Sequence, residues 1–450
     1  MRLVVLGGGG FRVPLLHRAL LADVEDGGGI VDELVLVDTD RDRLASVRAV
    51  LDHQDAAVGT RPFSIRTTTE LDEGLAGADA VFSAIRVGGL AGRILDEQVA
   101  RRHGVIGQET VGAGGISYAL RTIPVVKRIA ERIAATVPDA WVVNFTNPAG
   151  VVTEVMSAVL GERVIGICDS PAGLCRHAAR AASVKLDRVQ FDYVGINHLG
   201  WLRAMSVDGV DRLPGLLADP VALESFEEGA LFGAPWLQAL GAIPNEYLHY
   251  YYFARDVLEA SGGPSRGEVL FDQQEEFYSA APGRPETAND VWTSALLARE
   301  QSYLAENRRA VEAGPRAEAD LDSGGYTGVA LAVLRAVERD EPARLIVNVR
   351  NFGAVSGIAD ESVVEVPCVV DGRGARPLPT EPLSDHQAGL VHAVKACEAE
   401  TIIAALTGSR RAALRAFAWH PLVDSVTVAR GILDAYLSAL PGLGAILHRP

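Results

Sequence analysis

Lysine is scarce in this chain, and positive charge is outweighed by negative charge. The 450 residues include 42 Lys and Arg against 58 Asp and Glu, for a formal net charge of −16, and three of the cations are lysine. An acidic chain of this kind lacks the excess of positive charge with which proteins bind nucleic acid. It also lacks a basic amphipathic stretch for an anionic membrane surface. The composition therefore predicts neither nucleic-acid nor membrane partners.

Cysteines and long apolar runs are also few. The four cysteines (Cys168, Cys175, Cys368 and Cys397) form no CxxC pair and are too few for a disulfide framework. No apolar run reaches the roughly 18 residues that span a bilayer. The apolar start at residues 1–6 is too short for the core of a signal peptide and runs into four glycines. We therefore expect a cytoplasmic protein with reduced thiols.

The first half of the chain alternates between short apolar runs and helical patterns. Apolar residues make up 48% of the chain, which is enough for a large core. The runs at 2–6, 33–37, 80–85, 141–144 and 164–167 are separated by helical spacing at 14–24, 41–58, 117–137 and 149–160. Strands that alternate with helices of this length indicate βαβ units and a parallel sheet. The pattern predicts an α/β fold with a Rossmann-like, doubly wound parallel sheet.

The pattern changes near residue 189. Strands are predicted at 189–196, 199–207, 346–348 and 363–369, with helices at 290–312 and 327–339 and a helical end from 388 to about 440. No repeat or obvious linker separates the two parts. We expect two closely packed domains, residues 1–195 and 196–450.

A glycine turn follows the first strand. Gly7, Gly8, Gly9 and Gly10 come directly after the apolar run and open a helix, so the backbone could approach a pyrophosphate at the helix N-terminus. Asp38 ends the next strand, where a carboxylate would accept hydrogen bonds from the ribose of NAD and disfavour a 2′-phosphate. A plain strand-to-helix turn is the alternative. Together the two features favour binding of NAD.

Five polar segments follow apolar strands, at 83–93, 107–115, 144–148, 166–171 and 195–198. We expect them to be loops that line the crevice at the carboxyl ends of the parallel strands. Cys168 and His198 each stand at a strand end, and a thiolate and an imidazole are plausible ligands for one divalent ion. Taken singly, each is more often a buried structural residue.

The motifs in these segments resemble those of glycoside hydrolase family 4, whose members depend on NAD and a divalent metal. The motifs are Gly-Gln-Glu-Thr at 107–110, Asn-Phe-Thr-Asn-Pro at 144–148, Gly-Ile-Cys-Asp at 166–169 and Gly-Ile-Asn-His at 195–198. The resemblance continues through Pro-Asn-Glu-Tyr at 244–247 and Asn-Val-Arg-Asn at 348–351, and covers essentially the whole chain. It implies an N-terminal NAD-binding domain. It also implies a C-terminal α+β domain, like that of lactate and malate dehydrogenases, for substrate, metal and oligomerisation.

The resemblance also implies roles for single residues. Cys168 and His198 correspond to the ligands of the metal, usually Mn²⁺, and Tyr247 to the general base, with Tyr250, Tyr251 and Tyr252 as neighbouring alternatives. Glu109 corresponds to a residue that supports the basicity of the tyrosine, and Asp169 to the proton donor of the α-glycosidase branch. The substrate-binding positions correspond to Arg93, Asn147 and Arg266.

The chain departs from the family after the glycines. Many members have Ser/Thr-Tyr-Thr-Pro there, whereas this chain has Phe11 and Arg12 before Val13 and Pro14. Both Phe11 and Arg12 belong to the expected cofactor loop, and we expect Arg12 to supply a cation.

The family reaction implied by the resemblance oxidises the sugar at C3 with NAD⁺, removes the C2 proton, eliminates the aglycone, adds water and returns the hydride. A phosphorylated sugar is the expected substrate, most simply a 6-phospho-β-glucoside, because Arg12, Arg86, Arg93 and Arg266 fall in the expected crevice. The same family also offers 6-phospho-α-glucosidases, α-galactosidases and α-uronidases. An NAD-dependent 2-hydroxy-acid dehydrogenase or a nucleotide-binding protein without catalysis are the more distant alternatives. A homodimer or homotetramer is expected.

Overall fold

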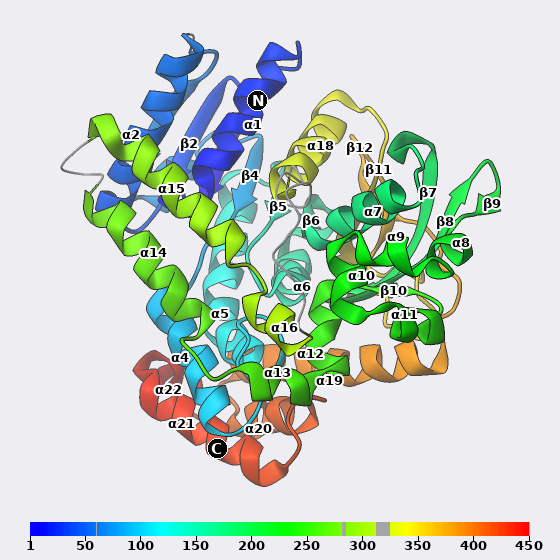
Figure 1. Cartoon of the computed structure of the whole chain (residues 1–450). Coiled ribbons are helices and arrows are strands. Elements are labelled where there is room, and N and C mark those ends of the chain that lie inside the picture. Colours follow the sequence, from blue (N-terminus) through cyan, green and yellow to red (C-terminus); the bar gives the residue numbers. More distant parts are fainter. Residues whose placement is uncertain (60, 281–284, 312–324, 450) are drawn as a thin grey trace.

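Six parallel strands form the centre of the N-terminal half (Figure 1). The structure is a computed structural model and describes residues 1–59, 61–280, 285–311 and 325–449. The strands lie in the order β3-β2-β1-β4-β5-β6. Their bounds are Arg2–Leu6 for β1, Glu33–Val37 for β2, Ser64–Thr68 for β3, Ala80–Ser83 for β4, Trp141–Asn144 for β5 and Val164–Gly166 for β6. This order is that of a Rossmann fold, which confirms the predicted fold class.

Helices cover both faces of this sheet because successive side chains of a strand point to opposite faces. In β1, Leu3 and Val5 join one apolar cluster, whereas Val4 and Leu6 join another. The first cluster includes side chains of α1 (Val13–Glu25), α2 (Arg41–Val58), α7 (Ser170–Ala181) and α18 (Gly325–Arg339). The second includes side chains of α3 (Leu71–Leu75), α4 (Gly89–Arg102), α5 (Gly112–Thr136) and α6 (Ala149–Leu160). The sheet is therefore buried on both sides.

Antiparallel strands extend the sheet beyond β6. The order continues β11-β12-β7-β8-β10, with β13 beside β12 and β9 beside β8. Their bounds are Val189–Ile196 for β7, Leu199–Val207 for β8, Val210–Asp211 for β9, Ile243–Pro244 for β10, Ala343–Arg350 for β11, Val363–Asp371 for β12 and Gly374–Pro377 for β13. The predicted domain boundary at 195/196 falls at the end of β7, which pairs with β8 and β12. Two separate domains stay a prediction, because one sheet runs through both halves.

Short helices fill the middle of the chain, and two longer ones return to the N-terminal half. The long helices, α14 (Arg266–Ala280) and α15 (Ala288–Gln301), pack on each other, on α4 and on α2 (Figure 1). The short helices are α8 (Leu213–Leu217), α9 (Pro220–Glu224), α10 (Glu227–Phe232), α11 (Ala234–Leu240), α12 (His249–Tyr252), α13 (Ala254–Ala260) and α16 (Ala305–Ala310). None of the helices in the described residues is long and apolar enough to cross a bilayer.

The helices predicted at 290–312 and from 388 to about 440 are interrupted in the structure. The first is divided into α15 and α16, with residue 312 outside the described residues. The second is divided into α19 (Asp385–Thr407), α20 (Arg410–Trp419), α21 (Val426–Ala439) and α22 (Pro441–Ile446). Gly408 ends α19 with φ +76°, a left-handed conformation that favours glycine. The C-terminal helices then pack on α4 and α5 of the N-terminal half.

Two segments predicted as loops are partly helical, and four strands of the described residues were not predicted. Residues 89–93 belong to α4, and residues 112–115 begin α5. A Cβ at Gly114 would lie 2.1 Å from the carbonyl oxygen of Gln108. Glycine at this position therefore allows the start of α5 to pack closely against the backbone, rather than making a loop flexible. Three of the unpredicted strands are short (β9, β10 and β13), and the longest is β3, whose sequence Ser-Ile-Arg-Thr-Thr is polar because it forms the edge of the sheet.

Candidate active site

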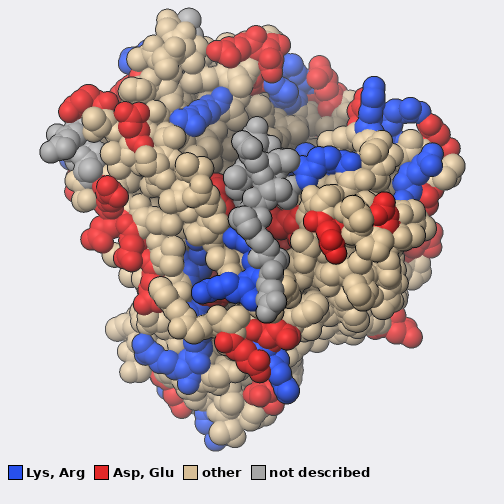
Figure 2. All heavy atoms as spheres, in the orientation of Figure 1, with Lys and Arg blue, Asp and Glu red and all other residues tan. Residues whose placement is uncertain are grey.

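A cavity of about 1130 Å³ opens where the parallel strands end. Every residue that the sequence predicts for the site lines this cavity except Gly8 and Gly9. Figure 2 shows Lys and Arg atoms gathered in a hollow near the middle of the face in view. The fold therefore brings together segments from residue 6 to residue 327 of the chain.

The glycine loop, residues 7–12, leaves no room for side chains on its strand side. Gly7 has φ +85°, and a Cβ there would lie 2.5 Å from the carbonyl oxygen of Ala84. The amides of Gly7 and Gly8 both donate to the carbonyl of Val37, and the Gly9 amide donates to Oδ2 of Asp38 at 2.9 Å. The backbone thus forms a close-fitting cradle beside a carboxylate, which fits the pyrophosphate and ribose of a dinucleotide.

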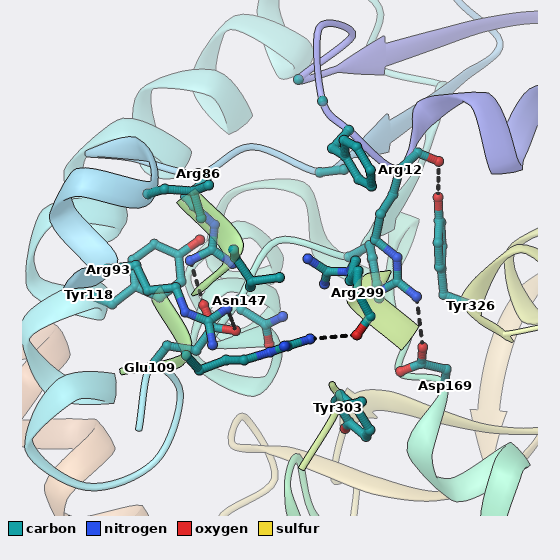
Figure 3. Close-up of a pocket in the computed structure, with 18 of the residues that line it drawn as sticks. Arg12, Arg86, Arg93, Glu109, Tyr118, Asn147, Asp169, Arg299, Tyr303 and Tyr326 are labelled. Atoms are coloured by element: carbon teal, nitrogen blue, oxygen red, sulfur yellow. Dashed lines mark hydrogen bonds and ion pairs between the residues drawn. The ribbon is translucent and has the colours of Figure 1, made fainter. Parts of the chain in front are cut away.

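Arg12 turns its guanidinium away from the glycines. Its Nη2 lies 3.3 Å from Oδ2 of Asp169, and its guanidinium stacks 4.5 Å from the ring centre of Tyr326 (Figure 3). Burial would lower the pKa of Arg12, but Asp169, together with Tyr326 and Glu300, raises the pKa above its usual value. The predicted cation is therefore present, and its partner is the predicted proton donor.

Cys168 follows β6 and His198 follows β7, and both are buried. Nδ1 of His198 lies 2.9 Å from Oγ1 of Thr110, whose hydroxyl donates to Oε1 of Gln108 at 2.9 Å. In this chain of hydrogen bonds His198 donates through Nδ1, which leaves Nε2 free to bind a metal. Thr110 is a supporting residue that the sequence analysis did not single out, although it lies in the Gly-Gln-Glu-Thr motif.

The protonation states at these two residues fit a metal site. Burial lowers the pKa of His198 to about 4, so the imidazole is neutral, as a ligand must be. Burial and the nearby Glu365 and Asp169 raise the pKa of Cys168, so a thiolate here needs a cation beside it. In the described residues no three His, Cys, Asp or Glu side chains form a metal-binding cluster. A metal held by Cys168 and His198 would therefore keep open positions for a substrate.

Tyr247 is the tyrosine that lies against the predicted metal ligands. Its ring stacks on His198, with ring centres 3.6 Å apart and an interplanar angle of 5°. Its hydroxyl oxygen accepts a hydrogen bond from Tyr303 at 3.2 Å. Tyr250 also lines the cavity, whereas Tyr251 lines a separate small pocket.

The environment of Tyr247 opposes its ionisation in the metal-free protein. Burial, followed by the charge of Glu246, raises its pKa, and the hydrogen bond from Tyr303 lowers it. Tyr303 lies inside the helix predicted at 290–312, where the structure has a break between α15 and α16, and it belongs to no motif, which is why the sequence analysis missed it. For Tyr247 to act as a base, its pKa must be lowered by such a hydrogen-bond donor and by a nearby cation.

Glu109 is held by arginines. Its carboxylate lies 2.6 Å from Nη1 of Arg86 and 2.7 Å from Nη1 of Arg93 (Figure 3). Burial would raise the pKa of Glu109, but Arg86 and Arg93 together lower it to about 2. The carboxylate is therefore ionised. Its predicted support of Tyr247 stays a prediction, because the partner of the Tyr247 hydroxyl is Tyr303.

Two further arginines line the cavity and have weaker contacts with carboxylates than Arg86 and Arg93. Arg266 donates to Oγ of Ser302 at 2.6 Å and to the carbonyl oxygen of Arg299 at 2.8 Å, both neutral acceptors. Arg299 lies 3.8 Å from Glu300. Burial, followed by repulsion from Arg12 and Arg266, lowers the pKa of Arg299. The sequence analysis missed Arg299, which faces the cavity from the end of α15 (Figure 3).

Glu246 is a second carboxylate that the sequence analysis missed, although it precedes Tyr247. It accepts hydrogen bonds from Ser170 at 2.5 Å and Tyr303 at 3.3 Å. Its Oε2 has no partner in the described structure. Burial and the nearby Glu228 raise the pKa of Glu246 to about 8, so this carboxyl is mostly protonated at neutral pH.

We expect Glu246 to make stability fall with rising pH. Its native pKa of about 8 exceeds the unfolded value of about 4.3, so the native state binds the extra proton between these pH values. Stability is therefore greatest below the unfolded pKa and falls as pH rises toward the native one. Between pH 5 and pH 8, the Tm of the wild type should fall by about 2–5 °C more than that of Glu246→Gln. Thermal unfolding at both pH values measures this, with Glu131→Gln on the surface of α5 as the control. Equal slopes for wild type and Glu246→Gln would refute the assignment.

Comparison with known proteins gives matches over both halves of the chain. Residues 2–184 match the model of family 4 glycosyl hydrolases, and residues 193–423 match the model of their C-terminal domain. A probable 6-phospho-β-glucosidase of Bacillus subtilis is 32% identical, over 98% of this chain and 96% of the relative. A 6-phospho-α-glucosidase of Lacticaseibacillus paracasei is 30% identical, over 83% and 82%.

Solved structures agree with this relationship. A 6-phospho-β-glucosidase of Thermotoga maritima, solved with manganese, NAD⁺ and glucose 6-phosphate, is 28% identical with a TM-score of 0.81 and covers 98% of this chain and 99% of its own. Malate dehydrogenase of Plasmodium falciparum, at 14% identity and a TM-score of 0.50, shares the fold alone, as expected for the C-terminal half. The matches over both halves show that the chain belongs to family 4 of the glycosyl hydrolases.

Proposed function

We propose that this chain hydrolyses 6-phospho-β-glucosides with the help of NAD and a divalent metal such as Mn²⁺. The observation that carries the phosphate is the pair Arg266 and Arg299, two half-buried arginines that line the cavity. Arg266 donates to neutral acceptors, and Arg299 lies as far as 3.8 Å from the carboxylate of Glu300. Arginines of this kind bind phosphate through charge-assisted hydrogen bonds. The similar Thermotoga enzyme, solved with glucose 6-phosphate, supports the same substrate class.

We assign the steps of this reaction to residues that line the cavity. When bound, the dinucleotide would exchange a hydride with the sugar, and the metal would stabilise negative charge next to the carbon that loses a proton. Cys168 and His198 would hold the metal, and residues 7–12 with Asp38 the dinucleotide. Tyr247 would take the proton from C2.

The remaining cavity residues act on the sugar and its leaving group. Asp169 would donate a proton to the departing oxygen. Arg93 and Asn147 would bind the sugar, and Arg266 its phosphate. Glu109, fixed between Arg86 and Arg93, would keep a negative charge in the cavity.

The β-anomer is supported by the relatives rather than by the cavity. The Bacillus relative named for β-glucosides is 32% identical over 98% of this chain, whereas the Lacticaseibacillus relative named for α-glucosides is 30% identical over 83%. A solved 6-phospho-α-glucosidase also covers 98% of this chain, at 26% identity, so the support for the β-anomer is the higher identity alone. A 6-phospho-α-glucoside is the second candidate, favoured by Asp169 at the proton-donor position. The dehydrogenase alternative has no support, because both halves match the glycosidase family. Cytoplasmic location and assembly as a homodimer or homotetramer stay predictions from the sequence.

The substrate is tested with 4-nitrophenyl β-glucoside 6-phosphate, its α-anomer and the unphosphorylated β-glucoside, each with NAD⁺ and Mn²⁺. We expect the phosphorylated β-glucoside to give the highest kcat/KM. In Arg299→Gln the preference for the phosphorylated over the unphosphorylated substrate should fall by about 10- to 100-fold, the usual worth of a hydrogen bond to a charged group. Arg309→Gln, which changes another arginine beside the cavity, is the matched control. Preference for the unphosphorylated glucoside would overturn the phosphate assignment, and preference for the α-anomer would favour the second candidate.

A further inference from the structure

Three helices from the second half of the chain donate hydrogen bonds to carbonyl groups of the glycine loop. The hydroxyl of Tyr278 in α14 donates to the Gly9 carbonyl at 2.7 Å. The indole Nε1 of Trp292 in α15 donates to the Phe11 carbonyl at 2.8 Å. The hydroxyl of Tyr326 in α18 donates to the Arg12 carbonyl at 2.6 Å (Figure 3). The loop is therefore held from outside by aromatic side chains.

The three bonds are not equivalent, because two of the peptide groups have a second restraint. The amide of Gly10 also donates to the Gly7 carbonyl, which fixes the peptide that Tyr278 holds. The Arg12 carbonyl also accepts from the amide of Leu15, which fixes the peptide that Tyr326 holds. Among the described residues, the Phe11 carbonyl accepts from Trp292 alone. Within the described part of the chain, Trp292 is therefore the single hydrogen-bonding restraint on the Phe11–Arg12 peptide.

The orientation of that peptide decides where one amide points. In a trans peptide the carbonyl and the following N–H point in opposite directions. Holding the Phe11 carbonyl toward Trp292 therefore turns the Arg12 N–H away from Trp292. This N–H has no hydrogen-bond partner among the described residues, whereas the amides of Gly9 and Gly10 are already bonded.

Free amides are few at this end of α1. The helix begins at Val13 without a side-chain cap, and Pro14 has no N–H to donate. The Val13 amide donates to the carbonyl of Gly10 and the Leu15 amide to that of Arg12. A dinucleotide pyrophosphate at the loop would find the Arg12 N–H among the few donors left.

Packing reinforces the role of Trp292. Its side chain is fully buried and joins Phe11, Val50, Phe277 and Ala288 in a small apolar cluster apart from the main cores. The ring centres of Phe11 and Trp292 lie 6.2 Å apart. The loop is thus fixed to α15 through both its side chain and its main chain.

We propose that Trp292 is a positioning residue for the dinucleotide, which it serves by fixing the Phe11–Arg12 peptide so that the Arg12 N–H faces the pyrophosphate. The inference rests on the proposed use of NAD. It extends the dinucleotide site to a helix that lies about 280 residues beyond the glycine loop in the sequence.

Calorimetric titration of the metal-loaded protein with NAD⁺ tests the proposal. Trp292→Phe keeps an aromatic ring but removes the N–H, and it should raise the Kd for NAD⁺ by about 10-fold. Tyr278→Phe and Tyr326→Phe are the matched controls, since each removes one donor to a loop carbonyl whose peptide keeps a second bond. Each control should raise the Kd by less than about 3-fold. Equal effects of all three changes, or no effect of Trp292→Phe, would overturn the proposal.

A second measurement needs no variant. In hydrogen–deuterium exchange of the wild-type protein, NAD⁺ should slow the exchange of the Arg12 amide strongly. An exchange rate of this amide that NAD⁺ leaves unchanged would overturn the proposal, even if Trp292→Phe fails to fold. A wild type that binds no NAD⁺ would refute the proposed function as well. Normal NAD⁺ binding by wild type and Trp292→Phe alike would refute the positioning role alone.

Discussion

Replacing Tyr247 by phenylalanine should lower kcat by about 10²- to 10⁴-fold, the usual contribution of a general base. Phenylalanine keeps the ring that stacks on His198 but removes the oxygen that accepts the hydrogen bond from Tyr303. The packing of the cavity should therefore survive while proton removal from C2 is lost. In D₂O the wild type should place deuterium at C2 of the product sugar, and Tyr247→Phe should place almost none.

The neighbouring tyrosines provide the controls for this experiment. Tyr250 lines the same cavity, with its ring centre 6.4 Å from that of Tyr247. Tyr252 accepts a hydrogen bond from Trp201 and lies 3.0 Å from Nε2 of His386. Tyr250→Phe and Tyr252→Phe should both retain deuterium incorporation. If Tyr250→Phe loses it and Tyr247→Phe does not, Tyr250 is the base.

Removal of the metal should reduce activity to background, and Mn²⁺ should restore it in the wild type but not in Cys168→Ser. Two protein ligands are proposed, so the replacement of one removes half of the bonds that the protein would make to the ion. Metal content after dialysis against Mn²⁺, measured by mass spectrometry, should fall to near zero in Cys168→Ser and in His198→Ala. This readout does not depend on turnover.

Cys175→Ser is the matched control for the metal experiment. Cys175 is also buried and lies in α7, but it does not line the cavity. Its replacement should leave metal content and activity close to those of the wild type. Full activity of the wild type after exhaustive dialysis against a chelator would refute a catalytic metal.

The predicted elements with strong local signals agree closely with the structure. The strands Arg2–Leu6 and Glu33–Val37 and the helix Arg41–Val58 have the predicted bounds, because each has a clear apolar period and a distinct stop. The interrupted helices and the edge strand Ser64–Thr68 lacked such signals. Their limits depend on turns and on neighbouring strands, which local periodicity does not encode.

The motifs at strand ends located most of the candidate site for a similar reason. Parallel strands carry their following loops to one edge of the sheet, so the glycine loop, Asp38 and Cys168 could be placed together before any contact was known. Glu109, between α4 and α5, and His198, after the antiparallel strand β7, reach the same cavity for reasons that this rule does not give. The order of the motifs along the chain then indicated the family. Which tyrosine of 247–252 faces His198 depended on the turn that follows β10, and the sequence left it open.

The sequence by itself determined the fold class, the family and the segments that line the cavity, because these depend on local periodicity and on motifs at strand ends. Only the tertiary structure placed Arg299 in the cavity, Tyr303 on Tyr247 and Trp292 on the Phe11 carbonyl. Each of these contacts joins segments far apart in the chain through a single polar atom. The packing of α14 and α15 back onto the N-terminal half creates the contacts of Arg299 and Trp292, and no pattern within one segment records where another segment will pack.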